Sequence, residues 1–151
     1  MIDNTIEQIK SVKLAYIDGI DQGNYDLLYT VFADVVEVDV SESLYDPETK
    51  IMHVSIPKAG RCDGKSLAES MAMLANVAKT KHTVADPIVT ETLDDMISVT
   101  WPMTDQVEYL IPNNFSKFEG TGYYHETYVK VNGSWKIASL RLERTHLKLN
   151  Y

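Results

Sequence analysis

Residues 119–137 read EGTGYYHETYVKVNGSWKI, and this stretch decides the fold because it predicts a β-hairpin. The dipeptide Asn132-Gly133 lies between two runs of strand composition, and it is the strongest short-range signal of a two-residue hairpin turn. The strand before the turn is expected over residues 119–131 and the strand after it over residues 135–147. Two long antiparallel strands are therefore predicted for the last part of the sequence.

Several stretches before this hairpin also have the composition of strands. Residues 81–91, 96–104 and 106–111 are rich in β-branched and other apolar side chains. Residues 35–40 read VVEVDV, and this alternation is typical of a strand with one buried face. A weaker strand is expected at 50–56, within the least readable part of the chain.

The beginning of the sequence has the pattern of an amphipathic helix. Apolar side chains recur every three or four residues, at Ile6, Ile9, Val12, Tyr16 and Ile20. Asn4 and Glu7 have the spacing of a capping box that would open this helix. Gly19 and Gly23 provide a natural end for it.

Two further helices are expected before the run of strands. Asn24 can cap a short one. Ser66 and Glu69 form a second capping box, and the helix that it opens would end near Lys79 or Lys81. This element order predicts an α+β fold, in which about three helices pack on one face of a curved antiparallel sheet.

Length and charge limit the class of protein. The 151 residues are expected to form one domain, residues 1–151. The formal net charge is −8, and an acidic surface repels phosphate, so neither nucleic acid nor an anionic membrane is an expected partner. The first ten residues lack the pattern of a signal peptide, and no stretch has the apolar length of a membrane span. We therefore expect a cytoplasmic location.

The sequence offers little that would bind a metal or a cofactor. The single cysteine, Cys62, can form neither an internal disulfide nor a thiolate zinc cage. The histidines at 53, 82, 125 and 146 show no H-x-H or H-x-x-x-H spacing. Gly120-x-Gly122 lacks the third glycine and the following helix of a dinucleotide site. No metal site and no cofactor are therefore expected.

Four stretches are similar to those of one known family. They are residues 15–28, residues 101–105 (WPMTD), residues 120–137 and residues 140–144. They resemble the first helix pair, the central W-x-M-x-D strand, the closing hairpin and the last strand of SnoaL-like proteins. These are a branch of the nuclear-transport-factor-2-like superfamily that includes enzymes of the scytalone dehydratase and bile-acid dehydratase type. The resemblance covers nearly the whole chain except residues 41–60, and it implies a cone-shaped fold. It implies less about chemistry, because this fold hosts dehydratases, isomerases, cyclases, epoxide hydrolases and inactive subunits.

The resemblance implies a catalytic dyad of Asp21 and His82. In this family an aspartate from the end of the first helix pairs with a histidine from the strand after the third helix, and these two residues hold those positions. A carboxylate that accepts one imidazole N–H leaves the other ring nitrogen free as a base. Without the resemblance, Asp21 could be an ordinary helix-end residue and His82 an ordinary strand residue.

Tyr16 is implied as the third catalytic residue, a hydrogen-bond donor to a substrate carbonyl or enolate oxygen. It lies five residues before Asp21, which is a separation of about 140° around a helix. The two side chains would share a face only if the helix ended between them, for which Gly19 is suited. The alternative is a tyrosine of the core.

The residues expected to bind the substrate lie on the predicted strands: Trp101, Met103, Asp105, Tyr124 and Arg144. If Trp101 and Met103 face the pocket, strand alternation places Asp105 on the same face, where a buried carboxylate needs a partner. The resemblance implies Arg144 as that partner. Arg141 is the alternative, because Arg144 and Trp135 can share a face only with a bulge between them. Asp105 could also be an ordinary residue at the end of a hairpin. The pattern leaves open whether the row with Tyr124 or the row with His125 faces the pocket.

These residues predict a cofactor-independent lyase or isomerase that acts on an apolar, oxygenated small molecule such as a steroid, terpenoid or polyketide. His82 would remove a proton next to a carbonyl, and Asp105 with Arg144 would assist departure of hydroxide or position the substrate. An epoxide hydrolase that uses Asp21, Asp105 and Arg144 is one alternative, and a non-catalytic binding or oligomerisation module is another. A homodimer or homotrimer joined through the outer face of the sheet is expected, because strands such as 119–131 carry apolar side chains on both faces.

Overall fold

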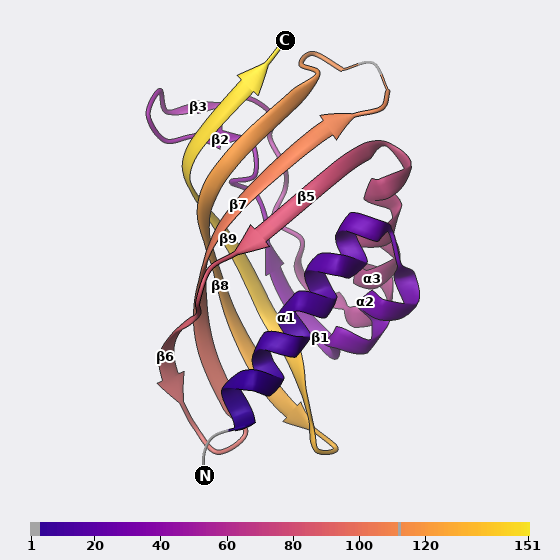
Figure 1. The fold of residues 1–151 in the computed structure, drawn as a ribbon, viewed down its shortest axis with the longest axis vertical. Coiled ribbons are helices and arrows are strands. Elements are labelled where there is room, and N and C mark those ends of the chain that lie inside the picture. Colours follow the sequence, from indigo (N-terminus) through magenta and orange to yellow (C-terminus); the bar gives the residue numbers. More distant parts are fainter. Residues whose placement is uncertain (1–3, 112) are drawn as a thin grey trace.

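A long, strongly curved sheet is the frame of the protein (Figure 1). The computed structural model describes residues 4–111 and 113–151, and in it the strands of this sheet lie in the order β4-β1-β9-β8-β7-β5, with β6 also paired to β7. The strands are β1 (Phe32–Asp39), β4 (Gly60–Asp63), β5 (Ala78–Val84), β6 (Ile88–Thr92), β7 (Met96–Tyr109), β8 (Lys117–Val131) and β9 (Ser134–Asn150). Two short strands, β2 (Tyr45–Asp46) and β3 (Ile51–Met52), form a separate pair.

The helices gather on one side of the sheet, which we call its inner face (Figure 1). They are α1 (Asn4–Gln22), α2 (Tyr25–Val31), α3 (Gly64–Ala72) and a short 3-10 helix, η1 (Met73–Asn76). The predicted α+β cone with three main helices is confirmed. None of the described helices is both long and apolar enough to cross a membrane.

One strand departs from the predicted antiparallel sheet. β1 runs parallel to β9, whereas the other neighbouring strands of the large sheet are antiparallel. β1 and β9 are far apart in the sequence, so no hairpin turn constrains their relative direction.

The helix caps agree only in part with the prediction. Asn24 caps α2, and its side-chain oxygen accepts a hydrogen bond from the backbone N–H of Leu27 at 3.1 Å. For α3 the cap is Asp63 and not Ser66, since the Asp63 carboxylate accepts the backbone N–H of Ser66 at 3.0 Å. The prediction that α3 continues to about Lys79 is wrong, because the chain passes through η1 into β5.

Strand boundaries also differ from those predicted. The two strands expected at 96–104 and 106–111 are one continuous strand, β7, which ends at Tyr109, so Asp105 lies inside a strand and not at a hairpin end. The weak strand expected at 50–56 is reduced to β3, and β4 was not predicted. β3 has two residues and β4 has four, and runs as short as these carry little periodic signal.

The predicted hairpin turn is present, and β9 contains two irregularities beyond it. Asn132 and Gly133 have φ values of 50° and 83°, the left-handed conformations of a tight two-residue turn. The pairing of β9 with β8 shifts register between Thr127 and Tyr128, and again between Thr121 and Gly122. Because of the first shift, the buried row of β9 changes from odd positions to even ones: Trp135, Ile137, Leu140, Leu142 and Arg144.

The core contains a buried ion pair that the sequence analysis did not identify. Lys13 on α1 contacts Glu126 on β8, with 2.6 Å between Nζ and Oε2, and neither side chain has exposed surface. The other carboxylate oxygen of Glu126 accepts the Tyr128 hydroxyl at 2.6 Å. Burial lowers the pKa of Lys13, and the charge of Glu126 opposes this effect. The pair joins α1 to the middle of the sheet.

Loss of one member of this pair is expected to destabilise the protein. Lys13→Met leaves Glu126 as an unpaired buried charge, which costs roughly 3–5 kcal/mol of unfolding free energy. Lys13→Met combined with Glu126→Gln removes both charges and keeps an acceptor for Tyr128, so it should recover most of the loss. Urea unfolding measures both variants, and a Lys13→Met protein as stable as the unsubstituted one would contradict the expectation.

Candidate active site

A cavity of about 400 Å³ lies between the inner face of the sheet and the helices. We call it the site cavity. Its ionisable lining residues come from five elements: Tyr16 of α1, His82 of β5, Asp105 and Tyr109 of β7, Tyr124 of β8 and Arg144 of β9. Most other lining residues are apolar, among them Ile20, Leu67, Met71, Leu74, Val107, Phe118 and Leu142. A mainly apolar cavity with a few converging polar groups is typical of a small-molecule site.

His82 and Asp21 are hydrogen-bonded, as the family resemblance implied. The Nδ1 atom of His82 lies 2.6 Å from Asp21 Oδ1. The backbone N–H of His82 donates to Oδ2 of the same carboxylate at 3.0 Å, and the Thr80 hydroxyl donates to Oδ1 at 2.8 Å. The side chain of His82 is 9% exposed and lines the site cavity. The carboxylate therefore fixes both the backbone and the ring of His82.

The charge of Asp21 determines which nitrogen of His82 is available. Burial alone would raise the pKa of Asp21, but the hydrogen bonds from His82 and Thr80 outweigh it and hold this pKa below its usual value. An ionised carboxylate can only accept hydrogen bonds, so Nδ1 carries the proton of the neutral imidazole. Within the described parts of the chain Nε2 has no hydrogen-bond partner, so its lone pair is free.

Asp21 itself lies behind the cavity wall. α1 continues to Gln22, so the expectation that the helix ends between Tyr16 and Asp21 is wrong. Tyr16 and Ile20 line the cavity, and Asp21, on a different side of the helix, faces β5. Gly19 does not break the helix; its missing side chain lets α2 approach, since a Cβ there would lie 2.6 Å from the Leu28 side chain.

Tyr16 belongs both to the cavity wall and to the core. It is 2% exposed, and its ring packs edge-on against Phe32 and Tyr124, at centroid distances of 6.0 and 6.1 Å. Burial, reinforced by the negative charge of Glu126, raises its pKa far above the usual value. The hydroxyl therefore stays protonated and can serve as a hydrogen-bond donor in the cavity.

Asp105 and Arg144 form a buried pair, as the resemblance implied. The guanidinium binds the carboxylate through two parallel contacts, Nη1–Oδ1 at 2.7 Å and Nη2–Oδ2 at 2.8 Å. Its Nε donates to the Ser43 carbonyl at 2.9 Å. Asp105 is also the register partner of His82 on the neighbouring strand, so the ion pair and the dyad lie side by side. The alternative partner, Arg141, is on the opposite face of β9.

Gly120 and Gly122 make room for this arrangement. A methyl group at Gly120 would overlap the Arg144 guanidinium and lie 2.8 Å from Asp105 Oδ1. A methyl group at Gly122 would overlap the carbonyl of Glu143, at the second register shift of β9. In the sequence these two glycines resemble only an incomplete nucleotide motif. In the structure they allow close packing, because a side chain at either position would overlap its neighbours.

Two of the expected substrate-binding residues do not line the site cavity. Trp101 and Met103 face inward as predicted, at 2% and 4% exposure, but they lie within the packed core. Met103 supports the site from behind, since its sulfur lies 3.8 Å from Arg144 Nη1. Tyr124 does line the cavity, which shows that its row of β8 is the inward one. No group of three or more metal-binding side chains occurs among the described residues.

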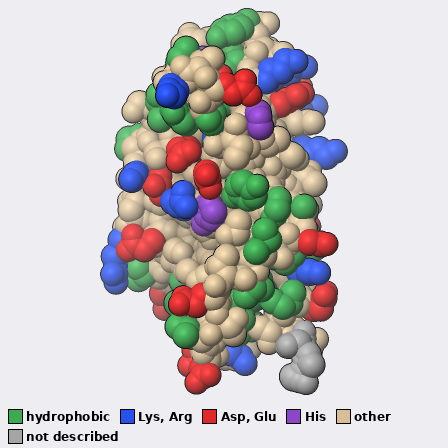
Figure 2. Space-filling view, turned by 90° about the vertical axis from the view of Figure 1, so that its left-hand side faces the viewer, with side chains coloured by type: hydrophobic (Ala, Val, Ile, Leu, Met, Phe, Trp, Pro, Cys, Tyr) green, Lys and Arg blue, Asp and Glu red, His purple; other side chains and the backbone are tan. Residues whose placement is uncertain are grey.

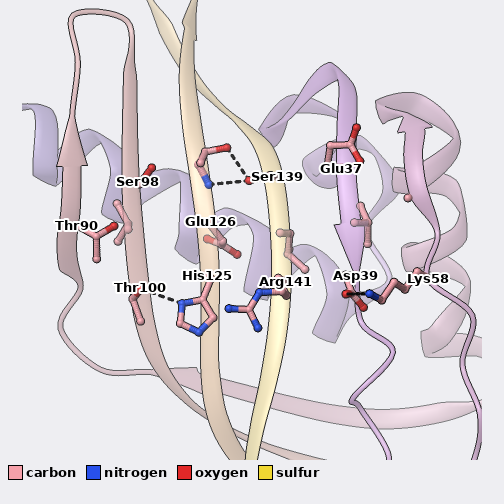
Figure 3. Close-up of a pocket in the computed structure, with 15 residues that line it drawn as sticks. Glu37, Asp39, Lys58, Thr90, Ser98, Thr100, His125, Glu126, Ser139 and Arg141 are labelled. Carbon is pink, nitrogen blue, oxygen red and sulfur yellow. Dashed lines mark hydrogen bonds and ion pairs between the residues drawn. The ribbon is translucent and has the colours of Figure 1, made fainter.

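A second, larger hollow of about 730 Å³ lies on the outer face of the sheet (Figure 3). His125 there contacts Thr100 at 3.0 Å and Glu143 at 2.7 Å, so both ring nitrogens are engaged. Figure 2 shows this side of the molecule with groups of charged side chains of both signs beside a group of apolar side chains. This hollow is separate from the dyad, since neither Asp21 nor His82 lines it. The homo-oligomer expected through this face stays a prediction.

The carboxylate of Asp21 is expected to make stability depend on pH. The pKa of Asp21 is lower in the folded protein than in the unfolded chain, where it is about 3.9. The ionised carboxylate therefore contributes fully to the free energy of unfolding above the unfolded-state pKa, and this contribution is lost as the pH falls through the folded-state pKa. Asp21→Asn should cost about 2 kcal/mol at neutral pH and much less in acid. Urea unfolding at both pH values tests this, with Asp18→Asn on the exposed side of α1 as the control. A loss of equal size at both pH values would contradict it.

Comparisons with known proteins identify the family and the fold of the chain. The SnoaL-like domain family matches residues 4–141. No curated protein matches the chain.

Three solved structures illustrate the shared fold. The hexachlorocyclohexane dehydrochlorinase LinA-type3 of Novosphingobium barchaimii has a TM-score of 0.72 at 13% identity, over 95% of this chain and 88% of that one. A candidate scytalone dehydratase of Novosphingobium aromaticivorans has a TM-score of 0.71 at 17% identity, over 97% and 87%. A nuclear-transport-factor-2-like protein of Salmonella enterica has a TM-score of 0.66 at 15% identity, over 92% and 89%. At these identities the likeness concerns the fold, and the family follows from the match over residues 4–141: this chain belongs to the SnoaL-like domain family, with a nuclear-transport-factor-2-like fold.

Proposed function

We propose that the protein is a cofactor-independent lyase that removes a proton next to a carbonyl group of a small, uncharged, mainly apolar molecule. The observation that carries the proposal is the 2.6 Å contact between Asp21 and Nδ1 of His82, which leaves Nε2 free beside an apolar cavity. The dehydratase and dehydrochlorinase names among proteins of the same fold are in accord with an elimination reaction.

The residues divide the chemistry among them. Nε2 of His82 takes the proton, and the resulting imidazolium is stabilised by the Asp21 carboxylate. A negative charge then develops on the carbonyl oxygen, and the hydroxyl of Tyr16, which keeps its proton, donates to it. Collapse of this enolate expels the hydroxyl group on the next carbon, and the imidazolium of His82 returns its proton to that oxygen, so that water leaves and the free base is restored. Arg144, held by Asp105 beside the dyad, positions the substrate. A double-bond shift in the same substrate would use the same first step, so isomerisation is the nearest related reaction.

The charges in the cavity favour an uncharged substrate. Arg144 is already neutralised by Asp105 and also bound to the Ser43 carbonyl, so it offers no free positive charge to a carboxylate or phosphate. The apolar lining, with Leu67, Met71 and Phe118, suits a compact hydrocarbon framework such as a terpenoid, steroid fragment or polyketide.

The geometry does not favour the epoxide hydrolase alternative. That mechanism needs an arginine between two carboxylates. Arg144 contacts only one of the two, Asp105, whereas Asp21 is hydrogen-bonded to His82 and Thr80. His82, which has no part in that mechanism, lines the site cavity and is the partner of Asp21.

Proton abstraction can be tested before the natural substrate is known. β-Tetralone, a bicyclic ketone with acidic protons next to its carbonyl, is incubated with the protein in deuterated water, and proton NMR follows the exchange. The unsubstituted protein should accelerate exchange above the buffer rate, and His82→Gln should lose that acceleration by about 10²–10⁴-fold.

A second histidine of the chain provides a matched control. His125 also contacts a carboxylate, Glu143, but it lies on the outer face of the sheet. His125→Gln should therefore exchange β-tetralone as fast as the unsubstituted protein. Full exchange activity in His82→Gln, or no exchange by the unsubstituted protein, would argue against the proposal and favour a non-catalytic binding module.

A further inference from the structure

The mechanism above leaves two buried charged residues unexplained, Lys13 and Glu126. Their charged atoms lie 2.6 Å apart, and both side chains are fully enclosed. Removing two charges from water is unfavourable, and an apolar pair of similar volume often stabilises a core equally well or better. Stability alone is therefore a weak reason for an ion pair at this position.

The position of the Lys13 ammonium suggests a second role. Nζ lies 3.6 Å from the centre of the Tyr124 ring and 4.2 Å from the centre of the Tyr16 ring. Both of these tyrosines line the site cavity, as does Tyr109. The ammonium thus contacts both rings and the Glu126 carboxylate at once, without itself lining the cavity.

The neighbouring contacts hold this group in place. Lys13 and Tyr16 are one helical turn apart on α1, and Tyr124 and Glu126 are successive members of the inward row of β8. The other carboxylate oxygen of Glu126 accepts the Tyr128 hydroxyl at 2.6 Å, which holds the carboxylate in place. The two tyrosine rings also touch each other, with 6.1 Å between their centroids.

A cation against an aromatic ring attracts its π electrons. In a phenol this withdraws electron density from the oxygen and makes the hydroxyl a stronger hydrogen-bond donor. The effect is largest when the contact is buried, because no water screens the charge. Glu126 opposes part of it, since its negative charge raises the pKa of both phenols, but the ammonium is the charge in contact with the rings.

We propose that Lys13, held by Glu126, is a positioning residue that orients Tyr16 and Tyr124 and strengthens their hydroxyls as donors to an oxyanion formed in the site cavity. This inference rests on the proposed function, in which such an oxyanion develops on the substrate. In this arrangement the buried positive charge of Lys13 acts on the rings of both tyrosines.

The test compares an anionic probe with a neutral probe of nearly the same shape. Pentafluorophenolate, which is ionised at neutral pH, represents the oxyanion, and pentafluorotoluene represents the uncharged ring. Fluorine NMR titration gives the affinity of each probe for the unsubstituted protein and for the Lys13→Met/Glu126→Gln double variant. The double variant should bind pentafluorophenolate about tenfold more weakly and pentafluorotoluene equally well.

A matched control removes the same two charges from the exposed side of α1. Lys10 and Glu7 form an ion pair there at 3.5 Å, and Lys10→Met/Glu7→Gln should leave the affinities for both probes unchanged. If the Lys13 double variant loses affinity for both probes equally, the role of Lys13 is merely structural and the inference is overturned. The inference is also overturned if the double variant keeps its affinity for both probes.

Two outcomes with the unsubstituted protein separate this inference from the proposed function. If it exchanges β-tetralone protons through His82 but does not prefer the anionic probe to the neutral one, the role of Lys13 is overturned and the base mechanism stands. If it binds neither probe and exchanges no protons, the proposed function fails and this inference fails with it.

Discussion

The Asp21 carboxylate is the contact on which the geometry of the site depends. It receives hydrogen bonds from the Thr80 hydroxyl, from the backbone of His82 and from the His82 ring, so one side chain joins the end of α1 to β5. Eight residues earlier, roughly 12 Å along the helix, Lys13 joins α1 to Glu126 on β8. These two attachments fix the height and rotation of α1 over the sheet, and therefore place Tyr16 in the wall of the site cavity.

The charges around the cavity are arranged in pairs of opposite sign. Asp105 is bound to Arg144, Lys13 to Glu126, and Asp21 to a histidine that becomes a cation once it accepts a proton. Each pair consists of residues from two different elements, so charge neutralisation and fold are established together. A reaction that moves one proton within such a site changes the charge of His82 next to a carboxylate that is ready to stabilise it, and this is the condition that general base catalysis requires.

The sequence alone predicts those features that depend on local patterns. The Asn132-Gly133 turn, the Asn24 cap and the alternation of β1 each follow from a few neighbouring residues. The pairing of Asp21 with His82 and of Asp105 with Arg144 required a resemblance to a family, because these contacts join distant parts of the chain. Lys13 was detectable in principle: it lies between Ile9 and Tyr16 in the apolar stripe of the first helix, and a lysine on a buried face needs a partner. The first register shift of β9 is visible in the sequence, because its apolar positions change from Trp135 and Ile137 to Leu140 and Leu142. The packing that removes Trp101 and Met103 from the cavity leaves no such mark.

The tautomer of His82 in the resting protein is the most direct test of the free Nε2 lone pair. Long-range proton–nitrogen NMR correlations of protein with isotope-labelled histidine distinguish the two ring nitrogens. Where the ring is neutral, the contact with Asp21 predicts a protonated Nδ1 and an unprotonated Nε2. A neutral His82 with its proton on Nε2 would contradict this assignment, because the ring would then have no lone pair to offer a substrate in the cavity.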